Sequence, residues 1–193
     1  MSSNWETYKL ADLCDIGSSK RIFQHEYVDN GIPFFRSKEV IDKALGSFEP
    51  KDLLFISHDK FNEIKSKYNV PKAGELLLSS VGNRSGIPYV IKETDGDFYF
   101  KDGNLTWFRN FKKLDSDFFL YWMKSNEAKQ RINNSTQGSV RDSVGFDAIS
   151  SFALKLPKIQ EQRKIAKVLS LADQEIETLQ KKLDYLKQEK KAL

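Results

Sequence analysis

Polar side chains suited to binding nucleic acid gather in four short segments that contain serine or glycine. These residues are Lys20 and Arg21 in the first segment, Arg36 and Lys38 in the second, Asn83, Arg84 and Ser85 in the third, and Gln137, Ser139 and Arg141 in the fourth. Guanidinium, amide and hydroxyl groups hydrogen-bond to base edges, while lysines and arginines neutralise phosphates. Arg36 and Arg84 are the first candidates, because a guanidinium can donate two hydrogen bonds to one guanine.

At any single position in these segments, an ordinary solvated loop charge is the more common interpretation. We expect at least two of the four segments to contact DNA, but not all four. The net charge of the chain is +4; residues 157–193 hold nine Lys or Arg against six Asp or Glu, and residues 1–156 hold 22 against 21. Because residues 1–156 are nearly neutral, binding to nucleic acid there requires a local basic patch.

No combination of residues predicts catalysis. The segments Pro50–Asp52 and Glu63–Lys65 only loosely resemble the acidic groups of a magnesium-dependent nuclease. His25 and His58 are far apart and lack clustered cysteines, which argues against a zinc site. The sequence has neither a glycine-rich phosphate loop nor the Asn/Asp-Pro-Pro-aromatic motif of DNA adenine methyltransferases. We therefore expect no enzyme activity, no metal and no cofactor.

Length and composition predict one globular domain with an appendage. The chain has 193 residues, of which 39% are hydrophobic. Its single cysteine, Cys14, cannot form an internal disulfide and is expected to be a buried, unreactive thiol. The sequence has no apolar run long enough to cross a bilayer and no secretory-signal layout at its start. We expect a cytoplasmic protein without a membrane partner.

The pattern of turns and apolar residues predicts an α+β fold, in which a mixed-sheet globular domain precedes a long helix. Aromatic and β-branched runs between glycine or proline turns are typical of strands, and an Asp-Gly pair between two such runs is typical of a hairpin. The expected elements are strands within 5–16, 31–35 and 73–91, a hairpin within 97–109, helices within 57–67 and 115–133, and a helical turn followed by a strand within 146–157.

The last segment carries an apolar stripe with the spacing of a coiled coil. Steps of three and four residues connect Leu169, Ala172, Ile176, Leu179, Leu183 and Leu186, and the same steps continue to Lys190 and Leu193. A helix from Glu161 onward is about 50 Å long, at about 1.5 Å per residue. We expect a domain at 1–156 and a coiled-coil helix at 157–193. The alternative is an amphipathic helix that lies on its own domain.

Four segments, in order, resemble the specificity subunits of type I restriction-modification enzymes. The last segment, "LPKIQEQRKIAKVLSLAD", resembles the start of the family's conserved spacer helix. The matching residues are Pro157, Glu161-Gln162, Ile165-Ala166, Leu169 and Asp173. "GSSK" followed by "NGIPFFRSKEV", then "AGELLLSSVGNRSGIPYVI", and then "TQGSVRDSVGFDAISSFALKLP" resemble further family segments. Lys20 stands where the family usually has a proline, so the first of these matches is imperfect.

This resemblance implies a non-catalytic subunit that binds double-stranded DNA. A family subunit has two target-recognition domains, each reading one half of a bipartite sequence, held apart by two antiparallel helices. The subunit works with modification (methyltransferase) subunits and a restriction (motor-nuclease) subunit. One domain and one helix resemble half of such a subunit, which predicts a homodimer through the final helix. A piece of a longer subunit is the alternative to a natural half-subunit.

A protein-interaction adaptor without DNA affinity is the second functional hypothesis. It uses the same coiled coil, and the near-neutral globular part is its main support. A single basic face on the domain favours the DNA-binding hypothesis, and an even scatter of basic residues favours the adaptor.

Overall fold

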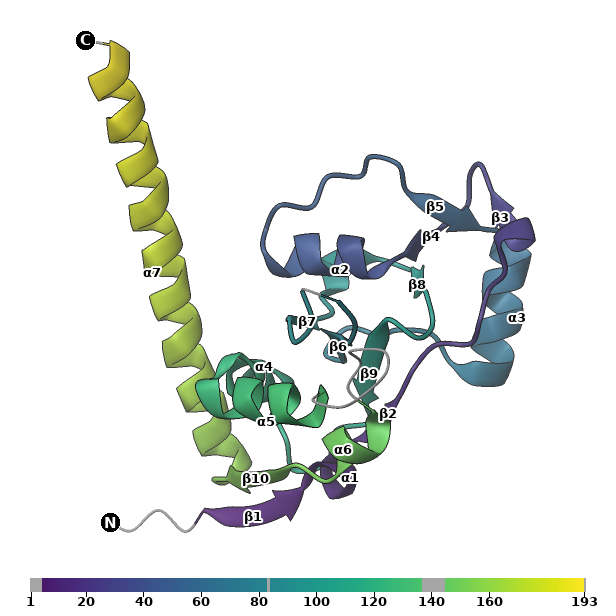
Figure 1. The fold of residues 1–193 in the computed structure, drawn as a ribbon, viewed down its shortest axis with the longest axis horizontal. Helices are drawn as coiled ribbons and strands as arrows, with labels where there is room; N and C mark the ends of the chain where they lie inside the picture. The colour runs from purple at the N-terminus through teal and green to yellow at the C-terminus, as the bar shows by residue number, and fades with distance from the viewer. Residues whose placement is uncertain (1–4, 83, 137–144, 193) are drawn as a thin grey trace.

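The computed structural model describes residues 5–82, 84–136 and 145–192, and its fold is α+β as predicted. A globular part contains three small sheets and six α-helices, and the long helix α7 (Ile159–Ala192) leaves it at one side (Figure 1). The ribbon shows that α7 runs beside α4 near its start and then diverges from the domain, so that α7 and the domain form the two arms of a V.

A four-stranded antiparallel sheet forms the middle layer of the domain. Its strand order is β2-β9-β6-β7, with β2 at Asp15–Gly17, β9 at Leu105–Arg109, β6 at Leu76–Ser79 and β7 at Pro88–Val90. The central strand β6 has Leu76 opposite Phe108 and Ser79 opposite Leu105. Side chains on this strand alternate between two hydrophobic clusters, because successive residues of a strand point to opposite faces. Both faces of the sheet are therefore buried.

A second four-stranded sheet is mixed. Its order is β3-β5-β4-β8, with β3 at Tyr27–Val28, β5 at Leu54–Ile56, β4 at Ile32–Phe35 and β8 at Tyr99–Phe100. Strand β4 pairs antiparallel with β5 and parallel with β8. Phe35 and Phe100 pack with Leu77 and Trp107 of the first sheet in one cluster, which joins the two sheets.

The third sheet connects the two ends of the globular part. It pairs β1 (Glu6–Lys9) with β10 (Ala153–Leu156), so that Glu6 lies opposite Leu156. The helices α1, α4, α5 and α6 pack over one face of the β2-β9-β6-β7 sheet, and α3 packs on the mixed sheet. The helix bounds are Leu10–Leu13 (α1), Ser37–Ala44 (α2), His58–Tyr68 (α3), Ser116–Lys124 (α4), Asn126–Thr136 (α5) and Phe146–Ser150 (α6). Short 3₁₀ turns lie at Gln24–Glu26 and Glu93–Asp95.

Two helices begin where side-chain caps predict. Ser57 accepts a hydrogen bond from the Lys60 amide at the start of α3, and Asp115 accepts from the amides of Asp117 and Phe118 at the start of α4. The predicted helix at 115–133 is present, but it is broken at Ser125, whose extended backbone separates α4 from α5.

The predicted hairpin within 97–109 is wrong. Strand β8 pairs with β4 in the mixed sheet, whereas β9 pairs with β2 and β6 in the other sheet. The Asp-Gly turn at 102–103 therefore carries the chain from one sheet to the next. The sequence pattern identified the turn correctly, but the partners of its flanking strands come from distant segments.

Candidate nucleic-acid interface

Three loops meet at one end of the β2-β9-β6-β7 sheet. Because neighbouring strands are antiparallel, the last residues of β2 and β6 and the first residues of β9 and β7 lie at the same end. We call this region the loop end; it consists of residues 18–21, 80–82, 84–87 and 101–104. Two of the four predicted segments, those with Lys20 and Arg84, are thereby brought together.

Hydrogen bonds connect these loops to one another. Ser18 Oγ donates to the Leu105 carbonyl at 3.1 Å and accepts from the Gly103 amide at 3.3 Å. The Ser80 amide donates to the Asn104 carbonyl at 3.0 Å, and the Lys20 amide donates to the Tyr99 hydroxyl at 2.6 Å. The loop end is thus a bonded unit, which can present side chains in fixed positions.

The loop between β6 and β7 is held by Ser79, which is fully buried. Its Oγ donates to the Arg84 carbonyl at 2.5 Å and accepts from the Ile87 amide at 2.9 Å, while its carbonyl accepts from the Gly86 amide at 2.7 Å. Gly82 and Gly86 have φ of 81° and 86°, a region that glycine adopts without strain. A buried hydroxyl and two glycines therefore fix the path that exposes Arg84.

Basic residues are concentrated at the loop end. Its described residues include Lys20, Arg21, Arg84 and Lys101 against the single acid Asp102. Residues 1–156 as a whole hold only one more basic than acidic residue, so the loop end is more positive than the nearly neutral domain around it. Lys101 and Asn104 were not among the predicted site residues. The KDGN segment would have indicated them if its turn had not been assigned to a hairpin.

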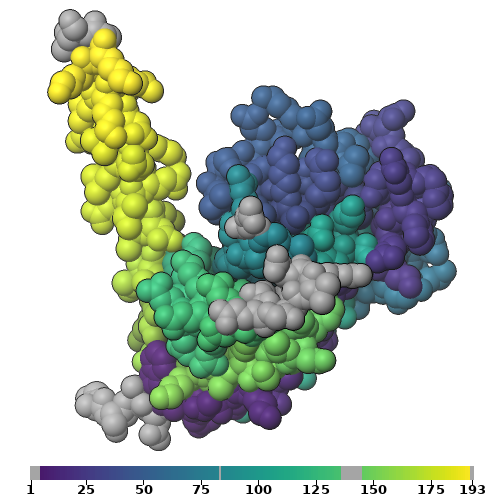
Figure 2. All heavy atoms as spheres, viewed as in Figure 1, coloured from purple at the N-terminus to yellow at the C-terminus, as the bar shows by residue number. Residues whose placement is uncertain are grey.

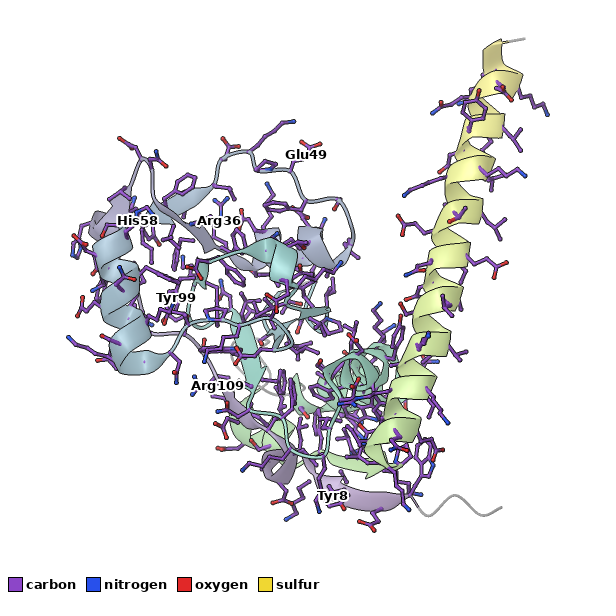
Figure 3. All side chains as sticks on the ribbon, turned by 180° about the vertical axis from the view of Figure 1, so that it is seen from behind. Tyr8, Arg36, Glu49, His58, Tyr99 and Arg109 are labelled. Atoms are coloured by element: carbon purple, nitrogen blue, oxygen red, sulfur yellow. The ribbon has the colours of Figure 1, made fainter. Side chains whose placement is uncertain are left out.

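Arg36, one of the two first candidates, is engaged within the domain. Its Nε donates to Glu39 at 3.1 Å, and its Nη2 donates to Glu39 at 2.5 Å and to the Asp52 carbonyl at 3.1 Å. The hydrogen bond with Glu39 is the main reason why the pKa of Arg36 is raised above its ordinary value. Figure 3 labels Arg36 in the half of the domain opposite Tyr8. A guanidinium with these partners is poorly placed to bind a base.

The remaining predicted residues divide into those with and those without a described position. Arg84 is 64% exposed, and its Nη1 lies 3.7 Å from Asp42. Lys20 is exposed, with Nζ 5.2 Å from the centre of the Tyr68 ring, and Lys38 is exposed on α2. Ser85 is partly buried, and its Oγ donates to the Ser79 carbonyl at 3.5 Å. The predicted contacts Asn83, Gln137, Ser139 and Arg141 lie outside the described residues.

The first turns of α7 are attached to the domain through a buried glutamine. Gln162 is 1% exposed; its Oε1 accepts from the Asp115 amide at 2.9 Å, and its Nε2 donates to the carbonyls of Lys113 and Pro157 at 2.8 and 2.9 Å. Farther along, Asp173 accepts from the Tyr121 hydroxyl and pairs with Lys124 at 3.5 Å. These contacts fix the direction in which α7 leaves the domain.

Beyond Asp173 the helix stands clear of the domain, as Figure 2 shows. Every residue from 171 to 191 is exposed. The apolar stripe is exposed as well, with Ile176 at 65%, Leu179 at 57% and Leu183 at 46%. The alternative that α7 lies on its own domain is therefore wrong for this part of the helix, and the stripe is available to a partner.

In the part of the chain that the structure describes, no helix is both long and apolar enough to cross a membrane. Within the same residues, no three His, Cys, Asp or Glu side chains are grouped so that they could hold a metal ion.

Comparison with known proteins gives one consistent family. A family model described as "Type I restriction modification DNA specificity domain" matches residues 2–188. The chain is 29% identical over 168 residues to a putative type I restriction enzyme specificity subunit of Haemophilus influenzae, a match that covers 85% of this chain and 40% of that protein. It is 23% identical over 202 residues to the MjaVIII specificity subunit of Methanocaldococcus jannaschii, covering 98% and 44%. The chain thus spans less than half the length of these relatives.

Solved structures share the fold. The HsdS subunit from Thermoanaerobacter tengcongensis matches with a TM-score of 0.63 and 18% identity, over 93% of this chain and 40% of that one. A chain from a structure concerned with complex assembly and conformational transition of the type I R-M system matches with a TM-score of 0.66 and 19% identity, over the same shares. At these identities the likeness supports the fold alone.

Proposed function

The chain belongs to the family of type I restriction-modification DNA specificity domains, and we propose that it recognises one half of a bipartite target in double-stranded DNA. In this proposal the globular part, residues 1–156, reads the DNA, and residues 157–193 form the spacer helix. The chain docks modification and restriction subunits, which supply methylation and cleavage, and it contributes no catalytic site. A cytoplasmic location is part of the same proposal.

The basic loop end is the observation that supports DNA recognition most directly. It gathers Lys20, Arg84 and Lys101 from three loops at one end of a rigid sheet. Serine hydroxyls and backbone amides hold these loops together. Most basic residues of the domain lie elsewhere, but at the loop end they outnumber the acidic ones, and this local excess of positive charge favours DNA over an adaptor without DNA affinity.

A charge-matched pair of variants tests this proposal. We expect Lys20→Ser/Arg84→Ser/Lys101→Ser to weaken binding to duplex DNA and to reduce the slope of log affinity against log salt by about 2 to 3, at about 0.9 per lost phosphate contact. The control removes the same charge at Lys9, Lys112 and Lys155, which are exposed outside the loop end. Equal loss in both variants, measured by fluorescence anisotropy across a salt series, would contradict recognition at the loop end.

We also propose that α7 pairs with the same helix of a second copy, through Leu169, Ala172, Ile176, Leu179, Leu183 and Leu186. The steps between these residues read the same in both directions, so two antiparallel helices can match the stripe completely. Leu169 then packs against the partner's Leu186, Ala172 against the partner's Leu183, and Ile176 against the partner's Leu179. Each of these pairs joins the first apolar position of the heptad in one helix to the second apolar position in the other helix.

Charges beside the stripe favour the antiparallel arrangement. In the heptad, Glu175 and Lys182 flank the stripe on one side and Lys187 flanks it on the other. Antiparallel pairing places Glu175 beside the partner's Lys182 twice, whereas parallel pairing places Lys182 beside the partner's Lys187 twice. Opposite charges attract and like charges repel, so the antiparallel pair is the more stable of the two.

This register sets the distance between the two recognition domains. Leu169 is level with the partner's Leu186, and Gln162 lies seven residues before Leu169, so the two Gln162 anchors lie about 31 residues, or about 46 Å, apart along the helix axis. At about 3.4 Å per base pair, this corresponds to about 14 base pairs. The bases of the two domains, at the Gln162 anchors, would therefore be held apart by rather more than one turn of DNA.

Sedimentation equilibrium tests the pairing. We expect the wild-type chain to be a dimer and Leu179→Glu/Leu183→Glu to be a folded monomer, because the two charges would be buried at the centre of the stripe. The control is Gln174→Glu/Gln188→Glu, on the face of α7 farthest from the stripe, which should remain a dimer. A wild-type monomer would refute the homodimer, but it would not bear on the proposal that the domain recognises DNA.

A further inference from the structure

The three arginines in or beside the loop end differ in how many of their donors remain available. Arg36 uses both Nε and Nη2 on acceptors inside the domain. Among the described residues, the carboxylate nearest to Arg84 is that of Asp42, at 3.7 Å, so this contact holds its orientation only weakly. Arg21 lies between these extremes, because its contacts with the described residues engage only Nε, at 2.8 Å from Asp102 Oδ2. Its side chain is 66% exposed.

The carboxylate that holds Arg21 is itself fixed in place. Asp102 is only 18% exposed and lies in the turn where the chain crosses between the two sheets. The amide before it, on Lys101, donates to the Phe35 carbonyl at 2.8 Å, and the amide after it, on Gly103, donates to Ser18 Oγ. Asp102 is therefore a rigid acceptor, and it constrains the end of a long side chain that would otherwise rotate freely.

The geometry leaves one mode of contact for the guanidinium. With Nε bound to Asp102, the two terminal Nη groups form the end that is free to donate. Two Nη groups donating together match the O6 and N7 acceptors that guanine presents in the major groove. Beside the pair lies a hollow of about 380 Å³ whose lining includes Gln24 and Lys101, which supply further donors.

We propose that Arg21 reads a guanine in the major groove and that Asp102 is its positioning residue. The proposal rests on the proposed DNA recognition and makes Arg21, rather than Arg36 or Arg84, the source of sequence preference at one base pair. Asp102 acts only through Arg21: it holds the guanidinium in the orientation that fits guanine, and it reduces the side-chain freedom that binding must remove.

The experiment begins with selection of the preferred duplex from a random pool by the wild-type chain. Affinities are then measured for that duplex and for its single-base variants. We expect Arg21→Ala and Arg21→Lys to reduce discrimination at one G·C pair by about tenfold to a hundredfold, while preferences at other positions persist. Arg163→Lys is the matched control, since Arg163 is 70% exposed and pairs with an 18% exposed aspartate, Asp115, at the base of α7.

The positioning role of Asp102 has its own readout. Asp102→Asn should reduce discrimination at the same base pair by a smaller factor, and it should cause no further loss of discrimination in the Arg21→Ala background. In the free protein, ¹⁵N NMR should show slower exchange of the Arg21 Nε proton in wild type than in Asp102→Asn. Circular dichroism checks that each substitution keeps the fold.

The other outcomes each overturn a definite statement. If Arg21→Ala weakens all duplexes equally, Arg21 contacts a phosphate and the guanine assignment is wrong. If discrimination is unchanged, Arg21 makes no specific contact at all. If Asp102→Asn acts equally with and without Arg21, Asp102 is not its positioning residue. A wild-type chain that binds no duplex would instead refute the proposed function itself.

Discussion

The attachment of α7 through Gln162 allows a quantitative prediction. The side chain is 1% exposed and makes three hydrogen bonds, which join the helix to the start of α4 and to the segment that precedes the helix. A buried hydrogen bond contributes about 1 kcal/mol net, and an unsatisfied buried partner costs about 1 to 3 kcal/mol. Gln162→Ala should therefore lower the free energy of unfolding by about 3 kcal/mol, which for a chain of this size corresponds to a fall in Tm of about 6–12 °C.

Urea unfolding followed by circular dichroism measures this change. The midpoint should fall while the slope with denaturant stays the same, because the surface exposed on unfolding is nearly unchanged. All variants are compared at one protein concentration, since pairing of α7 would make the midpoint depend on concentration. Gln160→Ala, two residues earlier at an exposed position, is the control and should change the free energy by less than about 0.5 kcal/mol.

Gln162→Leu separates the polar contribution from packing. Leucine has a similar volume but leaves the Asp115 amide and the two carbonyls without their partner, so it should destabilise about as much as alanine. If Gln162→Leu were as stable as wild type, or if Gln162→Ala lost less than about 1 kcal/mol, the hydrogen bonds would not be what holds α7 to the domain.

Two further predictions concern titratable groups. Burial alone would raise the pKa of Asp95, but hydrogen bonds from a backbone amide, Lys43 and Tyr89 outweigh it, so the pKa lies below its ordinary value. The ionised Asp95 carboxylate stabilises the fold above about pH 4, and this stabilisation is lost as pH falls through the lowered pKa. Asp95→Asn should therefore lower the free energy of unfolding by roughly 3 kcal/mol at pH 7. Thermal melts should show a smaller difference from wild type at pH 3. Burial raises the pKa of Cys14 to about 12, so at pH 8 iodoacetamide should alkylate it only after unfolding, as mass spectrometry would show.

Local sequence patterns predicted the elements whose causes are local. The final helix has regular apolar spacing, and α3 and α4 have capping side chains at Ser57 and Asp115. Such signals act within one turn of helix, so they can be read from neighbouring residues. The hairpin within 97–109 failed because strand pairing depends on distant segments, and β8 finds its partner in β4, more than sixty residues earlier.

The structure shows where the described candidate site residues lie, which the sequence could only partly predict. The segments with Arg21 and Arg84 do meet at the loop end, as basic residues beside strand ends suggested. Arg36 stays a prediction with less support than Arg21, because Glu39 and the Asp52 carbonyl occupy its Nε and Nη2 donors, which nothing in the linear sequence shows. Conversely, the orienting role proposed for Asp102 depends on a contact across eighty-one positions of sequence. All of the proposed DNA contacts stay predictions, and Asn83, Gln137, Ser139 and Arg141 lie outside the described residues.

The near neutrality of the globular part fits a molecule that reads DNA in pairs of half-sites. Because basic and acidic residues of the globular part nearly balance, the domain has little general attraction for phosphates, and under the proposed function one copy alone is expected to bind DNA weakly. Linking two such domains makes the second contact intramolecular, and the gain in affinity can reach about 10²- to 10⁴-fold when the spacing fits. That gain applies only to DNA that presents both half-sites at the distance set by α7. Weak charge on the domain and a rigid paired helix would thus act together, because each copy contributes little to nonspecific binding while the pair binds the matched target strongly.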